Sequence, residues 1–224
     1  MENLTLIIPA KNEEESLPIF LTELIDFNIK ALIVLPDKDE KTKDSIKNFK
    51  NIKIISQKKD GYGSAIIEGL SEVETEYCCI INADGSMDPK YLSSMLNECI
   101  EKDLVFASRY ENFKAGSDDD TIITYLGNKI FSLLGNLLFN LNISDILYTY
   151  ILGKTNSFRK LNLKNHDFRL CVEIPIKAKK KNFKYSTLPS YERNRIAGKK
   201  KVNALKDGFL ILIGMLSFIG KNFK

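Results

Sequence analysis

Residues 77–89 read YCCIINADGSMDP, and this stretch decides the fold. Residues 77–82 are mostly apolar, which is typical of a buried strand. Asp88 before Pro89 is a common start of a helix, with the aspartate as N-cap and the proline at the first helical position. The stretch therefore predicts a strand, a short loop that carries Asp84, and a helix that begins at Asp88.

The same alternation extends over the first 110 residues. Short apolar runs predict further strands at 4–9, 31–35, 52–56 and 104–108. The intervening segments predict helices near 17–25, 42–49 and 64–73. This alternation predicts the α/β class, with a mostly parallel sheet covered by helices on both faces. Because such sheets bind ligands beyond the carboxyl ends of their strands, we expect chemistry at 10–15, 37–41, 56–63 and 83–88.

The second half of the chain has a different character. Residues 121–152 are rich in Leu, Ile, Phe and Tyr and predict one amphipathic helix with a break at 142–145. A helix is predicted at 168–181 and a strand at 182–189. Residues 209–219 form an apolar run that covers about half of a bilayer's hydrocarbon core as a helix. We expect this run to lie in the membrane interface, to dip in and return, or to pack on the domain.

Composition bounds the class of protein. The 224 residues are 44% apolar and 28% charged, which fits one soluble α/β domain with a sizeable core. The net charge is +4, and basic residues gather between 177 and 206 beside apolar sequence. That arrangement suggests anionic lipid head groups or phosphates, with a solvated basic face as the alternative. No signal peptide is visible at the N-terminus, so we expect a cytoplasmic protein.

Cysteine and histidine usage argues against two common kinds of site. The four cysteines form no CxxC pair, and buried thiols in a reducing compartment are the simple interpretation. With a single histidine, His166, neither a histidine-based metal site nor a Ser-His-Asp triad has support.

Asp84 is the strongest single candidate for chemistry. It follows a buried strand and precedes Gly85, which is a suitable place to hold a divalent cation. Mg²⁺ or Mn²⁺ takes hard oxygen ligands, usually one or two carboxylates with phosphate oxygens and water. Such an ion would stabilise a diphosphate as a leaving group. A plain Asp-Gly turn is the alternative for Asp84, and a helix N-cap is favoured for Asp88.

A series of short motifs resembles those of glycosyltransferase family 2, whose members have the GT-A fold. The motifs are PAKNEEES at 9–16, IVLPD at 33–37 with Thr42, DGYGSA at 60–65 with EGL at 68–70, NADG at 82–85, SRY at 108–110, and Asp145. NADG falls where the family has its D-x-D metal motif, and Asp145 where it has an acceptor-side aspartate. Arg193 with GKKKV at 198–202 resembles the R…G-x-S-K tail of polyprenyl-phosphate mannosyl- and glucosyltransferases.

The resemblance implies an architecture and a reaction. It implies a GT-A domain with a Rossmann-like mixed, mostly parallel sheet over 1–205, divided into a nucleotide-sugar-binding half at 1–110 and an acceptor half at 111–205. Residues 206–224 would be a membrane-associating segment. The implied donor is a GDP- or UDP-sugar with Mg²⁺ or Mn²⁺, and the implied acceptor is a dolichyl or undecaprenyl phosphate. We expect an inverting transferase, peripheral or monotopic at the inner membrane face, with no nucleic-acid partner.

The resemblance also implies a set of site residues. The nucleotide-sugar pocket would include Pro9, Ala10, Asn12, Glu13, Asp37, Lys59, Asp60, Gly61, Gly63, Asn82 and Ala83. Asp84 would hold the ion together with Asn82. The phosphate-binding charges would be Arg109, Arg193 and Lys201.

The implied catalytic set is Asp84, Asp145 and Arg193. Asp145 is the candidate base for a hydroxyl acceptor, with a helix N-cap as the alternative role. A phosphate acceptor is already anionic near neutral pH and needs orientation more than a base.

The chain departs from the family pattern in four motifs. Pro36 replaces an acid of the second motif, Asn82 the first acid of the metal motif, and Lys200 the serine of the tail. The acceptor-side motif keeps Asp145 but loses its glycine and arginine. An amide at position 82 removes one negative charge, which is expected to weaken metal binding and to leave Asp84 as the principal ligand. Two alternatives stay open: a family-2 transferase with a soluble or cell-surface glycan acceptor, and a divergent, non-catalytic nucleotide-sugar-binding protein.

Overall fold

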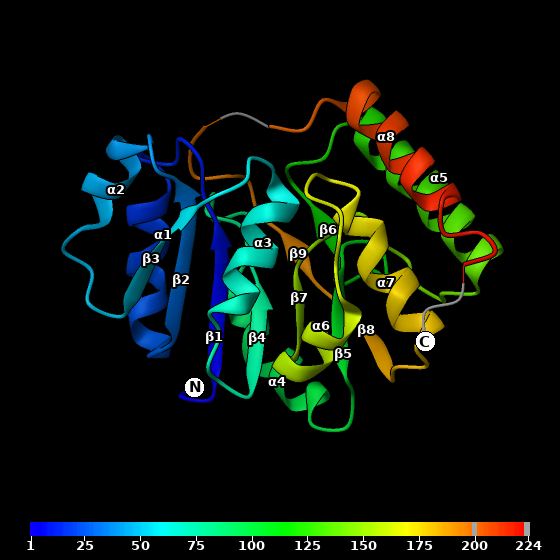
Figure 1. The fold of residues 1–224 in the computed structure, drawn as a ribbon, viewed down its shortest axis with the longest axis horizontal. Helices are drawn as coiled ribbons and strands as arrows, with labels where there is room; N and C mark the ends of the chain where they lie inside the picture. Colours follow the sequence, from blue (N-terminus) through cyan, green and yellow to red (C-terminus); the bar gives the residue numbers. More distant parts are fainter. Residues whose placement is uncertain (199–200, 222–224) are drawn as a thin grey trace.

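The computed structural model describes residues 1–198 and 201–221, and its centre is a seven-stranded sheet (Figure 1). The strand order is β3-β2-β1-β4-β7-β5-β8. These strands are β1 (Leu4–Pro9), β2 (Lys30–Pro36), β3 (Ile52–Gln57), β4 (Tyr77–Ile80), β5 (Leu104–Ser108), β7 (Ile151–Lys154) and β8 (Tyr185–Pro189). Neighbouring strands run parallel except for β7, which is antiparallel to both β4 and β5. The predicted α/β class with a mostly parallel sheet is confirmed.

Helices cover both faces of the sheet. They are α1 (Leu17–Leu24), α2 (Glu40–Ile46), α3 (Tyr62–Ser71), α4 (Leu92–Cys99), α5 (Ile122–Phe139), α6 (Thr155–Leu161), α7 (Leu170–Lys180) and α8 (Ala204–Leu216), with short 3-10 helices at Ile25–Phe27 and Pro89–Tyr91. On β1, Leu6 and Ile8 pack into one core with α1 and α4, whereas Ile7 packs into the other with α3. A strand buried on both faces has no polar side, which explains its unbroken apolar sequence.

Most predicted elements are present with shifted ends. The strand predicted at 77–82 ends at Ile80. The helix predicted at Asp88 begins as a 3-10 turn, and the Asp88 side chain accepts a hydrogen bond from the Lys90 backbone N–H at 3.0 Å. β7 and α6 have no counterpart among the predicted elements. β7 gives little local signal because it is four residues long and contains a glycine, Gly153.

The apolar run near the C-terminus packs on the domain and keeps an exposed side. α8 lies beside α5 and also contacts α7 (Figure 1). Its buried residues are Ile211, Gly214 and Met215, while Phe209 and Ile213 stay exposed. Lys199, Lys200 and the last residues of the predicted membrane segment, 222–224, lie outside the described part of the chain.

The loops in which functional residues were expected lie along one edge of the sheet. The parallel strands of the first half end there, so the loops 10–16, 37–39, 58–61 and 81–88 leave from this edge. Because β7 is antiparallel, the segment that precedes it reaches the same edge. A small second sheet of β6 (Gly116–Ser117) and β9 (Tyr191–Glu192) joins them, since Glu192 also bridges to Met87.

Candidate active site

Asp84 has one oxygen held inside its loop and one that faces charged side chains. Its Oδ1 accepts hydrogen bonds from the Ser86 backbone N–H at 3.1 Å and from the Ser86 hydroxyl at 2.8 Å. Its Oδ2 lies 3.5 Å from Nη1 of Arg195. Gly85, the next residue, has a φ of +72°, a conformation that glycine adopts without strain. The loop therefore aims a single carboxylate oxygen at the strand-end edge.

The strap, residues 191–198, runs along the Asp84 loop. The Arg193 backbone N–H donates to the Ser86 carbonyl at 2.9 Å, and the Ile196 N–H donates to the Asp84 carbonyl at 2.8 Å. The Arg193 guanidinium donates to the Gly85 carbonyl at 2.7 Å and pairs with Glu23 at 2.9 Å. Arg193 thus clamps the outside of the loop, and Arg195 is the arginine that faces the Asp84 carboxylate.

Asn82 uses its side-chain oxygen within the protein. Its Oδ1 accepts a hydrogen bond from the Tyr62 hydroxyl at 3.0 Å, and that hydroxyl also lies 2.6 Å from Thr149 Oγ1. Burial raises the pKa of Tyr62, so the phenol keeps its proton and remains a donor. Tyr62 is also fixed by stacking on Phe168, with ring centroids 5.1 Å apart. The oxygen predicted to ligate an ion therefore already accepts one hydrogen bond, from Tyr62, and keeps one lone pair.

Arg109 and Asp145 form a buried ion pair. Arg109 Nε donates to Asp145 Oδ2 at 2.8 Å, and its Nη2 donates to Oδ1 at 3.0 Å. The Arg109 backbone N–H and Asn128 Nδ2 each add a hydrogen bond, so every lone pair of this carboxylate has a donor. Nη1 of Arg109 pairs with Glu192 at 2.9 Å. This geometry is that of a structural pair; it leaves Asp145 no acceptor site for an incoming proton.

The loop after β1 is held by the start of α2. Pro9 ends the strand, and the Ala10 N–H donates to the Val34 carbonyl of β2 at 2.9 Å. The Asn12 N–H then donates to Asp39 Oδ2 at 2.7 Å, and the buried Asp39 also caps α2. Asp39 was not among the predicted residues, although an acidic residue just before a helix is a common capping signal. Its role is to fix the loop that carries Asn12 and Glu13.

The two loop glycines are needed for a contact within the protein. Gly61 has a φ of +116°, and a Cβ there would lie 2.1 Å from the His166 carbonyl oxygen. A Cβ on Gly63 would lie 2.3 Å from the Asn165 carbonyl oxygen. The 165–167 loop therefore packs against the two glycines that were predicted to line the nucleotide-sugar pocket. Lys59 and Asp60 are exposed.

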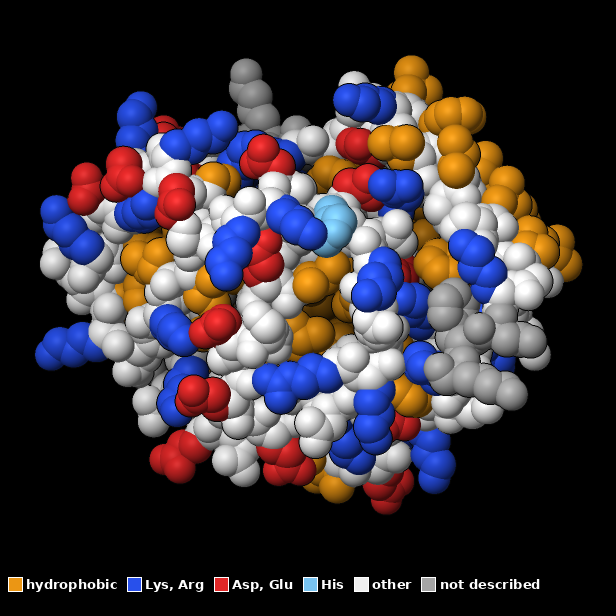
Figure 2. Space-filling model, in the orientation of Figure 1, with side chains coloured by type: hydrophobic (Ala, Val, Ile, Leu, Met, Phe, Trp, Pro, Cys, Tyr) orange, Lys and Arg blue, Asp and Glu red, His pale blue; other side chains and the backbone are white. Residues whose placement is uncertain are grey.

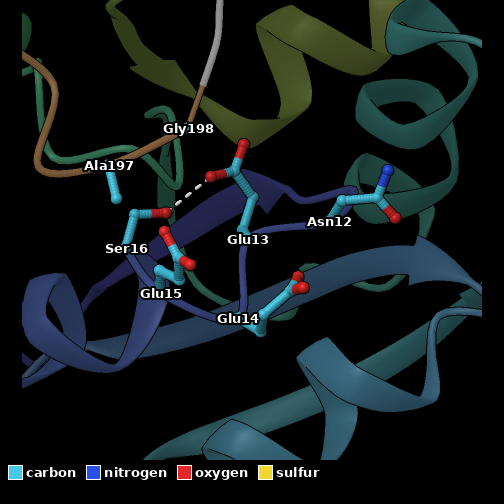
Figure 3. A pocket seen from close by; sticks show the side chains of 7 residues that line it. All are labelled: Asn12, Glu13, Glu14, Glu15, Ser16, Ala197 and Gly198. Carbon is cyan, nitrogen blue, oxygen red and sulfur yellow. Dashed lines mark hydrogen bonds between the residues drawn. The ribbon is translucent and has the colours of Figure 1, made fainter.

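Glu13 lines a small hollow (Figure 3). One of its oxygens forms an ion pair with Lys201, and the other accepts a hydrogen bond from the Ser16 hydroxyl at 2.5 Å. The hollow has a volume of about 180 Å³ and is lined by Asn12, Glu13, Glu14, Glu15, Ser16, Ala197 and Gly198. Its carboxylates suit hydroxyl or amide donors and repel phosphate. Asp37, in contrast, lies outside it with a largely exposed side chain that accepts from the Ser56 hydroxyl.

The residues around Asp84 are compatible with a divalent cation held jointly with a ligand. Within 1–198 and 201–221, no group of three or more His, Cys, Asp or Glu side chains is placed to hold an ion. Mg²⁺ and Mn²⁺ do not require such a group, since they are commonly bound by one or two carboxylates plus substrate phosphates and water. Asp84 Oδ2 offers one such ligand, and the rest would come from phosphate oxygens and water.

The structure thus divides the predicted residues into separate groups. Asn82, Ala83, Asp84 and Arg193 surround one loop, and Arg109 and Asp145 form the buried pair. Asn12 and Glu13 line the hollow beside the loop, and Lys201 pairs with Glu13. Arg195, which faces Asp84, was missed, although it lies only two residues after the predicted Arg193.

Comparisons with known proteins place this architecture in a class. Residues 5–161 match the model of glycosyl transferase family 2, and the chain belongs to that family. The glucosyl-3-phosphoglycerate synthase of Mycobacterium tuberculosis, solved with Mn²⁺, UDP and glucosyl-3-phosphoglycerate, superposes with a TM-score of 0.73 at 13% identity, over 99% of this chain and 81% of that one. That likeness confirms the predicted GT-A fold.

Sequence comparison also finds relatives of this chain, and two of them are as follows. An uncharacterized glycosyltransferase of Mycobacterium bovis is 33% identical over 94 residues, which span 42% of this chain and 42% of that protein. The dolichyl-phosphate beta-glucosyltransferase ALG5A of Trichomonas vaginalis is 27% identical over 222 residues, or 88% of this chain and 67% of that protein. The match to the mycobacterial relative therefore spans less than half of its length.

Proposed function

We propose that this chain transfers a sugar from a nucleotide-diphosphate donor to a polyprenyl phosphate at a membrane surface, with inversion. The observation that carries the transferase assignment is the Asp84 loop, which holds one carboxylate oxygen at the carboxyl edge of the sheet beside Arg195. Ligands of α/β sheets bind at that edge. Membership of family 2 supports the same chemistry.

The donor site in this proposal lies between the Asp84 loop and the loop after β1. A UDP-sugar is favoured over a GDP-sugar because the structural neighbour was solved with UDP and Mn²⁺. A divalent ion on Asp84 Oδ2 would neutralise the diphosphate leaving group. Arg193, Arg195 and Lys201 supply further positive charge around the same space. Asn12 and Glu13 line the adjoining hollow, where the sugar or ribose hydroxyls find acceptors.

The state of Asp145 favours a phosphate acceptor over a hydroxyl acceptor. A hydroxyl needs a base to remove its proton during attack. Asp145, the predicted base, is 1% exposed and already accepts four hydrogen bonds. A phosphate monoester is already anionic near pH 7 and attacks without a base. The name of the Trichomonas relative, a dolichyl-phosphate glucosyltransferase, supports the same acceptor class.

α5 supports the membrane part of the proposal, because it exposes its apolar side. The residues that it buries fully are Asn128, Ser132 and Gly135. Ten of the exposed large apolar residues on α5 and α8 form what we call the apolar ridge: Ile122, Ile123, Leu126, Ile130, Leu133, Leu137, Leu205, Phe209, Ile213 and Leu216. Figure 2 shows apolar side chains along the edge where Figure 1 places these two helices.

The ridge is large and suited to lying on a bilayer. A soluble monomer seldom exposes a continuous apolar surface of this kind. α5 has 18 residues with mean hydropathy 1.3 and only 17% of them buried, so by length and composition alone it is apolar enough to cross a membrane. It packs beside α8 and α7, however, and an apolar face on a surface helix fits insertion parallel to the interface. The membrane contact proposed here therefore extends beyond 206–224 to include α5.

A two-phase transfer assay tests this function. The full chain is incubated with Mn²⁺, radiolabelled UDP-glucose or GDP-mannose, and vesicles that contain undecaprenyl or dolichyl phosphate. We expect label to enter the organic phase, and 3-phosphoglycerate in place of the lipid to remain unlabelled. Label on phosphoglycerate alone, or release of free sugar alone, contradicts the lipid acceptor. No reaction or binding with any nucleotide sugar contradicts the transferase itself.

A further inference from the structure

We infer that Arg195 is the resident counter-cation of Asp84, and that a divalent cation has to displace its guanidinium to reach that carboxylate. The inference rests on the proposed function in one respect, namely that a cation binds at Asp84. The inference adds that the ion and the Arg195 guanidinium compete for the same carboxylate, that of Asp84.

Only one oxygen of Asp84 is accessible to either cation. Oδ1 is turned into the loop, where it accepts two hydrogen bonds from Ser86. Oδ2 is the atom that Arg195 Nη1 approaches at 3.5 Å. The Asp84 side chain is 12% exposed and the Arg195 side chain is 21% exposed. Solvent and salt therefore screen their attraction less than they would between surface charges. An ion bound to Oδ2 would therefore lie close to the Arg195 guanidinium, and the two positive charges would repel each other.

Arg195 has a second partner that keeps it near after it leaves Asp84. Its Nε and Nη2 donate to the two oxygens of Asp119 at 3.2 and 2.7 Å. Asp119 is itself held in a turn, since the Ser117 hydroxyl accepts hydrogen bonds from the Asp119 and Asp120 N–H groups at 3.1 Å. The bond to Asp119 is thus the shorter and better anchored contact. Arg195 can release Asp84 without losing its other anion.

The sequence departure at position 82 makes the competition sharper. With Asn82 in place of an acid, and its oxygen bound to Tyr62, the loop presents the single charge of Asp84. One carboxylate cannot neutralise a guanidinium and a divalent ion at the same time, and two cations close together repel each other. Removing the positive charge at 195 should therefore tighten binding of the ion, although the substitution adds no ligand.

Direct Mn²⁺ binding to the full chain, without donor, tests the inference. Free Mn²⁺ is counted by electron paramagnetic resonance for the wild type, Arg195→Met, Arg195→Lys and Arg193→Met. Arg193 is the matched control, because it carries the same charge on the same strap but contacts Gly85 and Glu23. We expect Arg195→Met to lower the Kd about three- to tenfold, with a change of less than about twofold in the other two variants.

Each contrary result is informative. An unchanged or higher Kd in Arg195→Met overturns the inference, as does an equal gain in Arg193→Met, which would show a bulk charge effect. Binding that survives Asp84→Asn in the Arg195→Met background also overturns it. If Mn²⁺ binds to none of the proteins, the inference falls, and transfer measured in a chelator then shows whether the proposed function stands without an ion.

A crystal structure of the wild type with Mn²⁺ tests the same point without any substitution. We expect the Arg195–Asp84 separation to open beyond ion-pair distance while the Arg195–Asp119 contact stays. Mn²⁺ on Asp84 with Arg195 unmoved overturns the inference.

Discussion

α3 and α5 are both amphipathic helices, but they bury opposite kinds of side chain. α3 buries Ile66 and Leu70 against the sheet, together with small residues. α5 fully buries Asn128, Ser132 and Gly135 and keeps its leucines and isoleucines mostly outside. Both patterns have the helical period, so periodicity alone identifies each helix but not the side that faces the protein.

The inverted burial of α5 has a structural cause. The segment that precedes β7 contains buried backbone groups and the Asp145 carboxylate, and polar side chains of α5 form hydrogen bonds with them. Asn128 donates to Asp145 at 2.6 Å, and the Ser132 hydroxyl accepts from the Ile146 N–H at 3.0 Å. Asn136 makes two hydrogen bonds to the backbone of Ile143. The fully buried residues of α5 are polar or small because they meet this segment, while Phe131, Leu134 and Phe139 pack partly against the core. The comparison teaches that burial inside the protein does not account for the exposed apolar side of α5, which is the side that the proposed membrane contact uses.

The largest effect is expected at Asp84, in the half of the molecule that contains α3. Asp84→Asn keeps an acceptor for Ser86 but removes the charge, so transfer should fall at least about 100-fold. Vesicle binding should not change, because the ridge is untouched. Asp88→Asn is the control, since asparagine caps a helix as well as aspartate does. Normal turnover in Asp84→Asn, measured by label transfer, would refute the assignment.

A complementary change on α5 should separate membrane binding from donor binding. Leu133→Ser with Leu137→Ser removes two of the most exposed leucines, at 68% and 77% exposure. Each is worth about 1.5 kcal/mol or more when withdrawn from water, so affinity for anionic vesicles should fall at least about tenfold. Mn²⁺ and UDP binding should stay as in the wild type. Unchanged co-sedimentation with vesicles would mean that the ridge faces something else.

Asn128→Leu tests the inner side of the same helix. The substitution makes α5 more apolar, yet it removes a donor from the buried Asp145 carboxylate. The free energy of unfolding should fall by about 1–3 kcal/mol, as measured by urea titration. Leu133→Ser alone is the control, because it replaces an exposed apolar residue of the same helix by a polar one. It should alter the free energy of unfolding by less than about 0.5 kcal/mol. A stabilised Asn128→Leu protein would show that the inverted burial is not what organises α5.

The last test compares one glycine in each helix, and the smallest effect is expected at Gly127. A Cβ on Gly69 of α3 would lie 2.6 Å from Ile7 Cγ2, whereas a Cβ on Gly127 of α5 meets nothing within 4 Å. Gly69→Ala should destabilise the protein by about 1–3 kcal/mol through overpacking. Gly127→Ala should stabilise it by about 0.5–1 kcal/mol through helix propensity. Thermal unfolding measures the change in stability of each variant. A change of the same sign in both variants would contradict the contrast between the helices.

The same contrast explains how much the sequence could predict. The strands and helices of the first half follow local apolar runs, so their positions and the placement of Asp84 beyond β4 were predicted. β7 depends on pairing with β4 and β5, strands that lie far away in the sequence, and a four-residue segment carries little local signal. The partners of Asp145 and Asn82 are also distant along the chain, which is why a buried pair and a bond to Tyr62 were not foreseen.

The position of β7 also decides how the polypeptide can be divided. It inserts between β4 and β5, so a fragment that stops at residue 110 would leave both strands with unpaired edges. The two halves inferred from the motifs are therefore regions of one cooperative unit and not separable modules. Split into two polypeptides at that point, the protein would regain its sheet only by fragment complementation, with residues 151–154 acting as the seam.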